Sequence, residues 1–135
     1  MCILVCEETG EVVRKRVPTI LLIDDEEQVR MLFQMALAQA GYRVLTAESG
    51  PHGLHLLQHQ EVDLALVDIF MPEMDGLELI QRLRATRPSS KIIAMSGGSW
   101  EWDYLDTAKQ LGADGTLKKP FSLQELLDAV SSQLN

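Results

Sequence analysis

The sequence predicts an α/β protein: a doubly wound, five-stranded parallel sheet with helices on both faces. Short apolar runs alternate five times with longer segments in which apolar residues recur at three- and four-residue steps, which is helical spacing. Several of the short runs are continuously apolar, as expected for strands covered on both faces. Parallel strands joined by right-handed helical crossovers are the simplest architecture for this alternation.

The first strand–helix unit is predicted from residue 19 onward. Residues 19–23 (TILLI) form an apolar run without a polar interruption, which indicates a buried strand. Gly41 lies where the following helix is expected to end. The helix is indicated by apolar residues at helical spacing: Val29, Leu32, Phe33, Ala36, Leu37 and Ala40.

The next two units follow the same pattern. Residues 42–47 (YRVLTA) alternate like a half-exposed strand, and Ser49 is a candidate N-cap for a short helix. Residues 62–68 (VDLALVD) predict a buried strand, and the helix after it ends before Pro88. The apolar residues of these two helices are Leu54, Leu56, Leu57, Leu77, Ile80 and Leu83.

The last two units complete the sheet. Residues 91–96 (KIIAMS) predict the fourth strand, and a helix over 104–111 closes at Gly112. Residues 115–119 (GTLKK) predict a short fifth strand, and Ser122 is a candidate cap for the last helix. That helix carries Leu123, Leu126, Leu127 and Val130.

Length and composition describe one soluble globular domain. The chain has 135 residues, of which 46% are hydrophobic and 24% charged, and its net charge is −8. The negative net charge of the domain argues against nucleic-acid binding, which needs clustered Lys and Arg. It is compatible with a bound cation, a basic partner or simply a solvated acidic surface.

We expect residues 1–16 to be a poorly ordered N-terminal extension and residues 17–135 to form the domain. Cys2 and Cys6 are the only cysteines, so the domain has no disulfide framework, and a reducing cytoplasm is compatible with this. The apolar run MCILVC is too short to span a membrane and lacks the basic start of a signal peptide. An extra edge strand or a lipidated cysteine is the alternative.

Polar residues stand at the predicted carboxyl ends of four strands, where open α/β sheets bind ligands. Asp24 and Asp25 follow the first strand, Asp68 ends the third and Ser96 ends the fourth. Lys119 ends the fifth. Carboxylates placed together repel one another unless a cation intervenes, and oxygen ligands suit Mg²⁺. A metal, a lysine, a hydroxyl and a carboxylate nucleophile would make a phosphoryl-transfer site.

Simpler interpretations of the same residues exist. Acidic residues are favoured at a helix start, which would explain part of the run 24–27 (DDEE) without a metal. Asp68 could merely end a strand, although a buried carboxylate is costly to leave unpaired, and Ser96 could be a turn residue. The spacing of His52, His55 and His59 could hold a metal, but without a carboxylate or cysteine partner a solvated helix face is the better interpretation.

The segments ILLIDDEEQVR, LALVDIFMPEMDGLELIQRLR, IIAMSGG and LKKPF resemble the receiver domain of bacterial two-component response regulators, including single-domain chemotaxis-type regulators. The resemblance covers about Val17 to Asn135, and it implies the flavodoxin-like strand order 2-1-3-4-5. It implies that Asp68 accepts a phosphoryl group from a histidine kinase or phosphotransfer protein. The metal would be Mg²⁺, bound directly by Asp25 and Asp68 and supported by Asp24.

The resemblance also assigns the remaining site residues. The backbone carbonyl of Phe70 would be a third metal ligand, Ser96 would be the switch hydroxyl, and Lys119 would be the site lysine, preceding a cis bond to Pro120. The helix 104–111, the strand 115–119 and the last helix would form the face that docks a downstream target or a second copy. In this interpretation the protein is cytoplasmic, is not an enzyme, and contacts neither nucleic acid nor membrane.

Three positions depart from the family pattern. Thr116 stands where an aromatic residue usually follows the switch hydroxyl inward, so any signal must pass through other side chains or through loop and helix shifts. Phe70 stands where polar residues are frequent, and we expect it to shield a phosphoryl group on Asp68. Gly98 stands two residues after the switch hydroxyl.

Two other functions compete with the phosphorylation switch. An aspartate-based phosphohydrolase also forms an acyl phosphate, but it needs a D-x-D pattern and a cap, whereas Asp24 and Asp25 are adjacent. A protein-interaction module that is not phosphorylated could keep the same fold. The complete set of Asp68, Ser96 and Lys119 argues against that module, while Thr116 is compatible with it.

Overall fold

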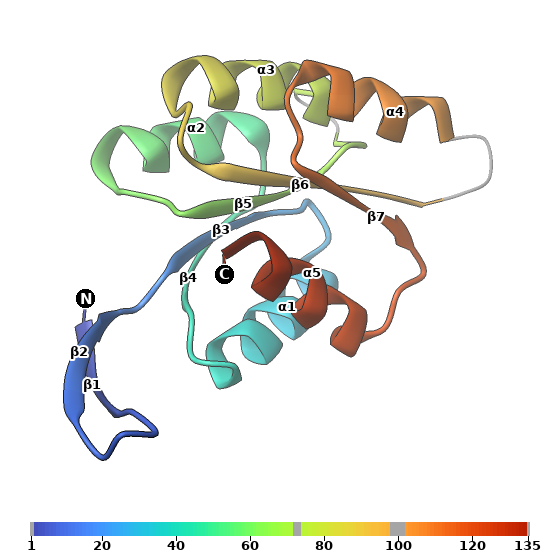
Figure 1. The fold of residues 1–135 in the computed structure, drawn as a ribbon. Coiled ribbons are helices and arrows are strands. Elements are labelled where there is room, and N and C mark those ends of the chain that lie inside the picture. The colour runs from blue at the N-terminus through green and yellow to red at the C-terminus, as the bar shows by residue number, and fades with distance from the viewer. Residues whose placement is uncertain (1, 72–73, 98–101, 135) are drawn as a thin grey trace.

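The computed structural model describes residues 2–71, 74–97 and 102–134 (Figure 1). Its main sheet has five parallel strands in the order β4-β3-β5-β6-β7, which confirms the predicted order 2-1-3-4-5 when counting starts at β3. The strands are β3 (Thr19–Ile23), β4 (Arg43–Ala47), β5 (Leu64–Asp68), β6 (Lys91–Gly97) and β7 (Gly115–Lys119). The helices are α1 (Glu27–Gln39), α2 (Gly50–His59), α3 (Gly76–Thr86), α4 (Trp102–Leu111) and α5 (Leu123–Leu134).

Helices cover both faces of the sheet, so the protein has three layers (Figure 1). The helices α1 and α5 lie on one face, and α2, α3 and α4 lie on the other. Side chains of a strand point alternately to opposite faces. Accordingly Leu21 and Ile23 join the apolar cluster under α2–α4, while Ile20 and Leu22 join the cluster under α1 and α5. This double coverage explains why β3 and β5 are buried along their whole length and are apolar apart from Thr19 and Asp68.

The helix boundaries follow local signals in the sequence. The Ser49 hydroxyl accepts a hydrogen bond from the His52 N–H (3.2 Å), and the Ser122 hydroxyl accepts one from the Glu125 N–H (3.0 Å), which confirms both predicted caps. Gly41 follows α1 with a positive φ of 100°, a conformation that favours glycine. Asp75 caps α3 through the Glu78 N–H (2.8 Å), a cap that the sequence analysis did not identify.

Residues 2–16, which we expected to belong to a poorly ordered extension, contain two short strands. They form an antiparallel hairpin of β1 (Cys2–Cys6) and β2 (Val12–Arg16) that projects from the body of the protein (Figure 1). The turn explains the hairpin: the Gly10 N–H donates to the Glu7 carbonyl (2.9 Å), and Gly10 has a φ of 84°, as in hairpin loops that end with a left-handed glycine. None of the described helices is both long and apolar enough to cross a membrane.

Candidate functional site

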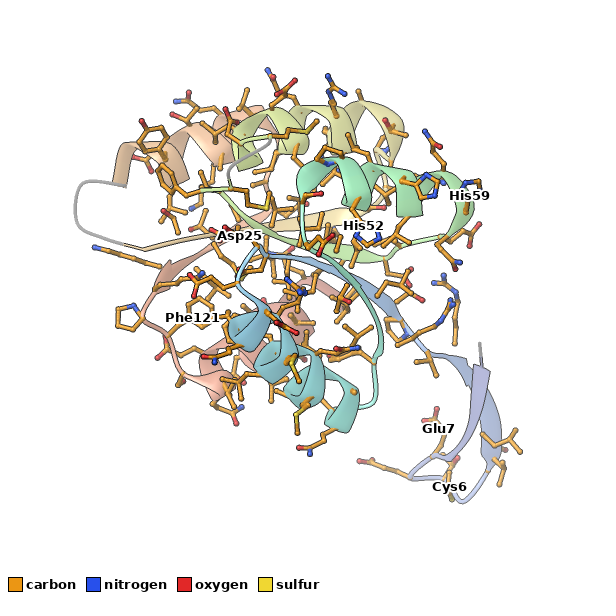
Figure 2. All side chains as sticks on the ribbon, turned by 180° about the vertical axis from the view of Figure 1, so that it is seen from behind. Cys6, Glu7, Asp25, His52, His59 and Phe121 are labelled. Atoms are coloured by element: carbon orange, nitrogen blue, oxygen red, sulfur yellow. The ribbon has the colours of Figure 1, made fainter. Side chains whose placement is uncertain are left out.

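Three carboxylates meet at the carboxyl edge of the sheet. Asp24 directly follows β3, Asp68 is the last residue of β5, and the two are 0% and 6% exposed. Asp25 is exposed beside them, in the loop between β3 and α1 (Figure 2). One oxygen atom from each carboxylate lies within 4.8 Å of the others. The structure therefore brings together the three acids that the sequence placed at strand ends.

The loop after β3 holds Asp24 in a fixed orientation. Its Oδ1 accepts a hydrogen bond from the Glu26 N–H (2.9 Å), and its backbone carbonyl accepts one from Nη1 of Arg30 in α1 (2.7 Å). Its own N–H donates to the Ala47 carbonyl at the end of β4 (3.2 Å). These three bonds orient the buried carboxylate, and the contribution of Arg30 was not predicted from the sequence.

Lys119 provides the positive charge at this edge. Its Nζ lies 3.4 Å from Oδ2 of Asp24 and 3.8 Å from Oδ2 of Asp68, and its side chain is 24% exposed. The bond from Lys119 to Pro120 is cis, as the resemblance implied. A single ammonium group thus faces the two buried carboxylates, so one net negative charge of that pair is left for another cation to balance.

Burial raises the pKa of Asp68 to about 7. Lys119 and the hydrogen bond from the Phe70 N–H to Oδ1 (3.3 Å) act in the opposite direction and lower it, while the nearby charges of Asp24 and Asp25 raise it. Without a further cation this carboxyl is therefore partly protonated at neutral pH. A cation between the carboxylates would favour the ionised form, which is the nucleophile.

Ser96 lies on the same edge of the sheet. In the pairing of β5 with β6, Asp68 is opposite Met95, and Ser96 is the next residue along β6. Ser96 is 1% exposed and lies in register with Lys118 of β7. The hydroxyl is therefore buried near the end of the strand that neighbours the one bearing Asp68. Gly98, two residues further on, lies outside the described residues.

The donor atoms suit a hard divalent cation. Among the described residues, Asp24, Asp25 and Asp68 form the single group of three or more acidic, His or Cys side chains with the spacing of a metal site, and all its donors are oxygen. The residues present therefore fit Mg²⁺. The predicted third ligand, the Phe70 carbonyl, belongs to a residue whose N–H already contacts Asp68.

The histidines of α2 do not belong to this site. His52, His55 and His59 are exposed, and Figure 2 shows His52 and His59 on α2. The rings of His55 and His59 meet edge to face with centroids 5.1 Å apart. Their exposure agrees with the interpretation of a solvated helix face.

Gly76, at the start of α3, lies directly behind Asp68. A Cβ atom at this position would lie 2.5 Å from Cα of Ile69 and 2.7 Å from the carbonyl oxygen of Asp68. The Gly76 N–H donates to the Ile69 carbonyl (2.7 Å). Only a residue without a side chain allows the start of α3 to pack so closely on the backbone that carries Asp68.

An aromatic contact reaches from this site to α4. The rings of Phe70 and Tyr104 have centroids 5.0 Å apart and an interplanar angle of 76°, an edge-to-face arrangement. Tyr104 belongs to the helix 104–111, which the resemblance assigned to the docking face, but the sequence did not indicate its contact with Phe70. Trp100 and the side chain of Trp102 lie outside what the structure describes.

Comparison with known proteins gives a consistent result. Residues 20–131 match the family model described as the response regulator receiver domain. The chain is 32% identical over 115 residues to sporulation initiation phosphotransferase F of Bacillus subtilis, covering 85% of this chain and 92% of that protein. It is 39% identical over 118 residues to the autoinducer 1 sensor kinase/phosphatase LuxN of Vibrio campbellii, covering 87% of this chain but only 14% of that protein.

The fold is also similar to solved structures. A CheY-like response regulator receiver domain protein from Methanospirillum hungatei superimposes with a TM-score of 0.84 at 28% identity, covering 88% of this chain and 94% of that one. Several relatives are much longer than this chain, which spans 12% of the sensor kinase CckA of Brucella abortus.

Proposed function

Because the chain belongs to the response regulator receiver domain family, which acts as a phosphoacceptor signalling switch, we propose that Asp68 is the residue that accepts the phosphoryl group. The observation that supports this most directly is the contact of Lys119 with both Asp24 and Asp68 at the carboxyl edge of the sheet. A carboxylate nucleophile, a neighbouring acidic pair and an ammonium group are the parts that phosphoryl transfer requires.

The proposed step is a displacement at phosphorus. A carboxylate oxygen of Asp68 forms a bond to the phosphorus atom while the bond from phosphorus to the donor nitrogen of a phosphohistidine breaks, and its electron pair goes to the imidazole. The product is an acyl phosphate on Asp68. Water later attacks this phosphorus and restores the carboxylate and free phosphate, so the chain returns to its starting state.

Each remaining residue has a distinct part in this step. Asp25, Asp68 and the Phe70 carbonyl would hold Mg²⁺, with Asp24 in support, and the ion would neutralise charge on the phosphoryl oxygens. Lys119 offers a point charge to a phosphoryl oxygen, and Ser96 offers a hydroxyl. Phosphorylation would replace the Lys119 contact with Asp68 by a contact with a more distant oxygen, which changes the packing near β6 and β7.

An apolar groove beside Lys119 is a suitable docking surface for the phosphoryl donor. It has a volume of about 340 Å³, and one of its sides is formed by α1, where Leu32 is 49% exposed. The groove is lined by Glu26, Val29, Leu32, Phe33, Lys119, Pro120 and Phe121. A histidine kinase or phosphotransfer protein must bring its imidazole to Asp68, so its contact surface must lie next to this edge.

A second surface of the protein is a candidate output surface. It consists of α4, β7 and α5, where Tyr104 and Leu123 are 40% and 38% exposed. We propose that a downstream protein or a second copy of the chain binds here when Asp68 is phosphorylated. Exposed aromatic and apolar side chains are frequent at such interfaces.

Intact mass spectrometry after incubation with acetyl phosphate and Mg²⁺ tests the phosphoacceptor. We expect a gain of one phosphoryl group that is absent from Asp68→Asn and is prevented by a chelator. The matched control is Asp128→Asn, which removes an exposed acid of α5 far from the site and should accept the group normally. An unchanged mass of the wild-type chain with several small donors would favour the interaction module instead.

A further inference from the structure

The side chain of Phe70 connects the carboxyl edge of the sheet to α4. Phe70 lies two residues after Asp68, and its ring packs edge to face on Tyr104 of α4 with centroids 5.0 Å apart. Both side chains are partly covered, with exposed fractions of 37% and 40%. The contact therefore joins the loop after β5 to the outer surface of α4.

The backbone of Phe70 takes part in the site itself. Its N–H donates to Oδ1 of Asp68 (3.3 Å), and this bond is one of the causes that lower the pKa of that carboxyl. When Oδ1 or Oδ2 becomes bonded to phosphorus, the charge and the hydrogen-bonding capacity of the group change. The Phe70 backbone must respond to that change, and its ring is attached to the same Cα atom.

β7 offers no aromatic ring for the same purpose. Thr116 occupies the middle of β7, half-buried and in register with Ala94 of β6. A threonine side chain is too short to span from the strand to the far side of a helix. Two other ring contacts among the described residues, Phe33 with Phe121 and His55 with His59, lie on α1, α2 and the segment before α5, away from α4.

The described side chains of α4 are buried along one side of the helix. Leu105 and Ala108 are buried against the core, at 7% and 0% exposure, whereas Tyr104 and Asp106 face outward. A shift of α4 about this anchored side would move Tyr104 relative to Phe70. The ring pair is thus placed to favour one position of the helix over another.

We propose that the Phe70–Tyr104 ring pair couples the state of Asp68 to the position of α4, and that Tyr104 is a positioning residue for the phosphoryl site. The inference rests on the proposed role of Asp68. Coupling between two sites is reciprocal in binding free energy: if the group on Asp68 moves α4, then a change on α4 must alter binding at Asp68 by the same factor. Tyr104 should therefore influence chemistry at a carboxylate that it does not touch.

Three variants separate this coupling from general loosening of the fold. Tyr104→Leu removes the ring, Tyr104→Phe keeps it, and Tyr42→Leu removes the half-buried tyrosine that packs near α1 on the other face of the sheet. Thermal unfolding first shows that each variant folds. Beryllium fluoride with Mg²⁺ then serves as the phosphoryl mimic, and hydrogen–deuterium exchange reports on the amides of residues 102–111.

We expect beryllium fluoride to change exchange in α4 of the wild type, Tyr104→Phe and Tyr42→Leu. In Tyr104→Leu this change should fall by at least half, and the concentration of beryllium fluoride at half-saturation should shift by about two- to tenfold, the range expected for an aromatic pair. The beryllium fluoride concentration at half-saturation distinguishes coupling from a purely local loosening of α4. Local loosening would alter exchange in α4 but would leave binding at Asp68 unchanged.

Several results would overturn the proposal. Tyr104→Leu could retain the wild-type exchange response and half-saturation, or Tyr42→Leu could lose both to the same extent. A wild-type chain that gains a phosphoryl group by mass but shows no exchange change in α4 would refute the coupling and leave Asp68 as the phosphoacceptor. A wild-type chain that gains no phosphoryl group would instead refute the proposed function on which the coupling rests.

Discussion

The ammonium group of Lys119 lies 3.4 Å from a carboxylate oxygen of Asp24, a side chain with no exposed surface. A charge as deeply buried as this is stable only beside an opposite charge or a hydrogen-bond donor. The same ammonium group is 3.8 Å from Asp68, so it serves two carboxylates. The stability of this edge of the sheet therefore depends on the balance between one ammonium group and two buried carboxylates.

Replacing Lys119 by Met should raise the pKa of Asp68 further and destabilise the fold at pH 8. Lys119 now lowers that pKa, and its removal leaves two buried carboxylates facing each other. We expect a loss of about 1–3 kcal/mol in the free energy of unfolding, measured with urea. Lys109→Met, which removes an exposed lysine of α4, is the matched control. Equal losses in the two variants would contradict the prediction.

Replacing Asp68 by Asn should stabilise the metal-free protein above pH 7. Folding raises the pKa of Asp68 from 3.8 to about 7. Between these two pH values the unfolded chain has lost the proton while the folded chain still holds it, so the free energy of unfolding of the wild type falls as the pH rises. The asparagine amide of the variant does not ionise, so the variant does not carry the cost of a buried negative charge. The advantage of the variant should be absent below pH 4, grow to at most about 4 kcal/mol near pH 7, and stay constant above it. A pH-independent difference in urea unfolding would refute this cause.

Mg²⁺ should stabilise the wild-type chain at pH 8. An ion that binds only the folded state adds about 1.4 kcal/mol to the free energy of unfolding at ten times its dissociation constant. We expect the melting temperature to rise with Mg²⁺ at constant ionic strength, and to rise less at pH 5, where protonation of Asp68 competes. Asp25→Ala should lose the effect, and Asp128→Asn should retain it.

Replacing Gly76 by Ala should damage the site through the backbone. The new Cβ would lie within 2.7 Å of backbone atoms of Asp68 and Ile69, which cannot rotate away as a side chain can. We expect a loss of about 1–3 kcal/mol in unfolding free energy, together with slower phosphorylation by acetyl phosphate. Gly115→Ala is the control, because its nearest neighbours are side-chain atoms at 3.2 and 3.7 Å. Wild-type phosphorylation in Gly76→Ala would show that the start of α3 can move freely.

Replacing Phe70 by Asn should shorten the life of the phosphoryl group. We expect the ring to shield a phosphoryl group on Asp68 from water, whereas an amide can orient an attacking water molecule. The half-life of the phosphorylated chain, followed by intact mass after removal of the donor, should fall several-fold. If the half-life of Phe70→Asn equals that of the wild type, the ring does not shield the group.

The position of the site could be predicted from the sequence because parallel strands end at the same edge. Asp24, Asp68, Ser96 and Lys119 each follow or end a predicted strand, so a correct alternation of elements is sufficient to bring them together. The Asp75 cap could also have been found, because Asp75 and Glu78 have the spacing of a capping box.

Other features depend on information that local patterns do not contain. The contact of Phe70 with Tyr104 depends on how α4 is rotated over the sheet, which is decided by packing between layers. The hairpin of residues 2–16 was missed because one apolar run at a chain end does not show whether it has a strand partner. Gly10 at the turn was the one signal that favoured a hairpin.

The polarity of the sheet has a practical consequence for measurement. The hairpin joins the body near Asp63, to which Arg16 is bound at 2.6 Å, and Gln133 near the end of α5 contacts the Asp114 carbonyl at the start of β7. Both contacts lie at the amino ends of the strands, away from Asp68. A tag or surface tether at either end of the chain would therefore attach away from the edge that carries Asp68, so an immobilised chain should remain open to a phosphoryl donor.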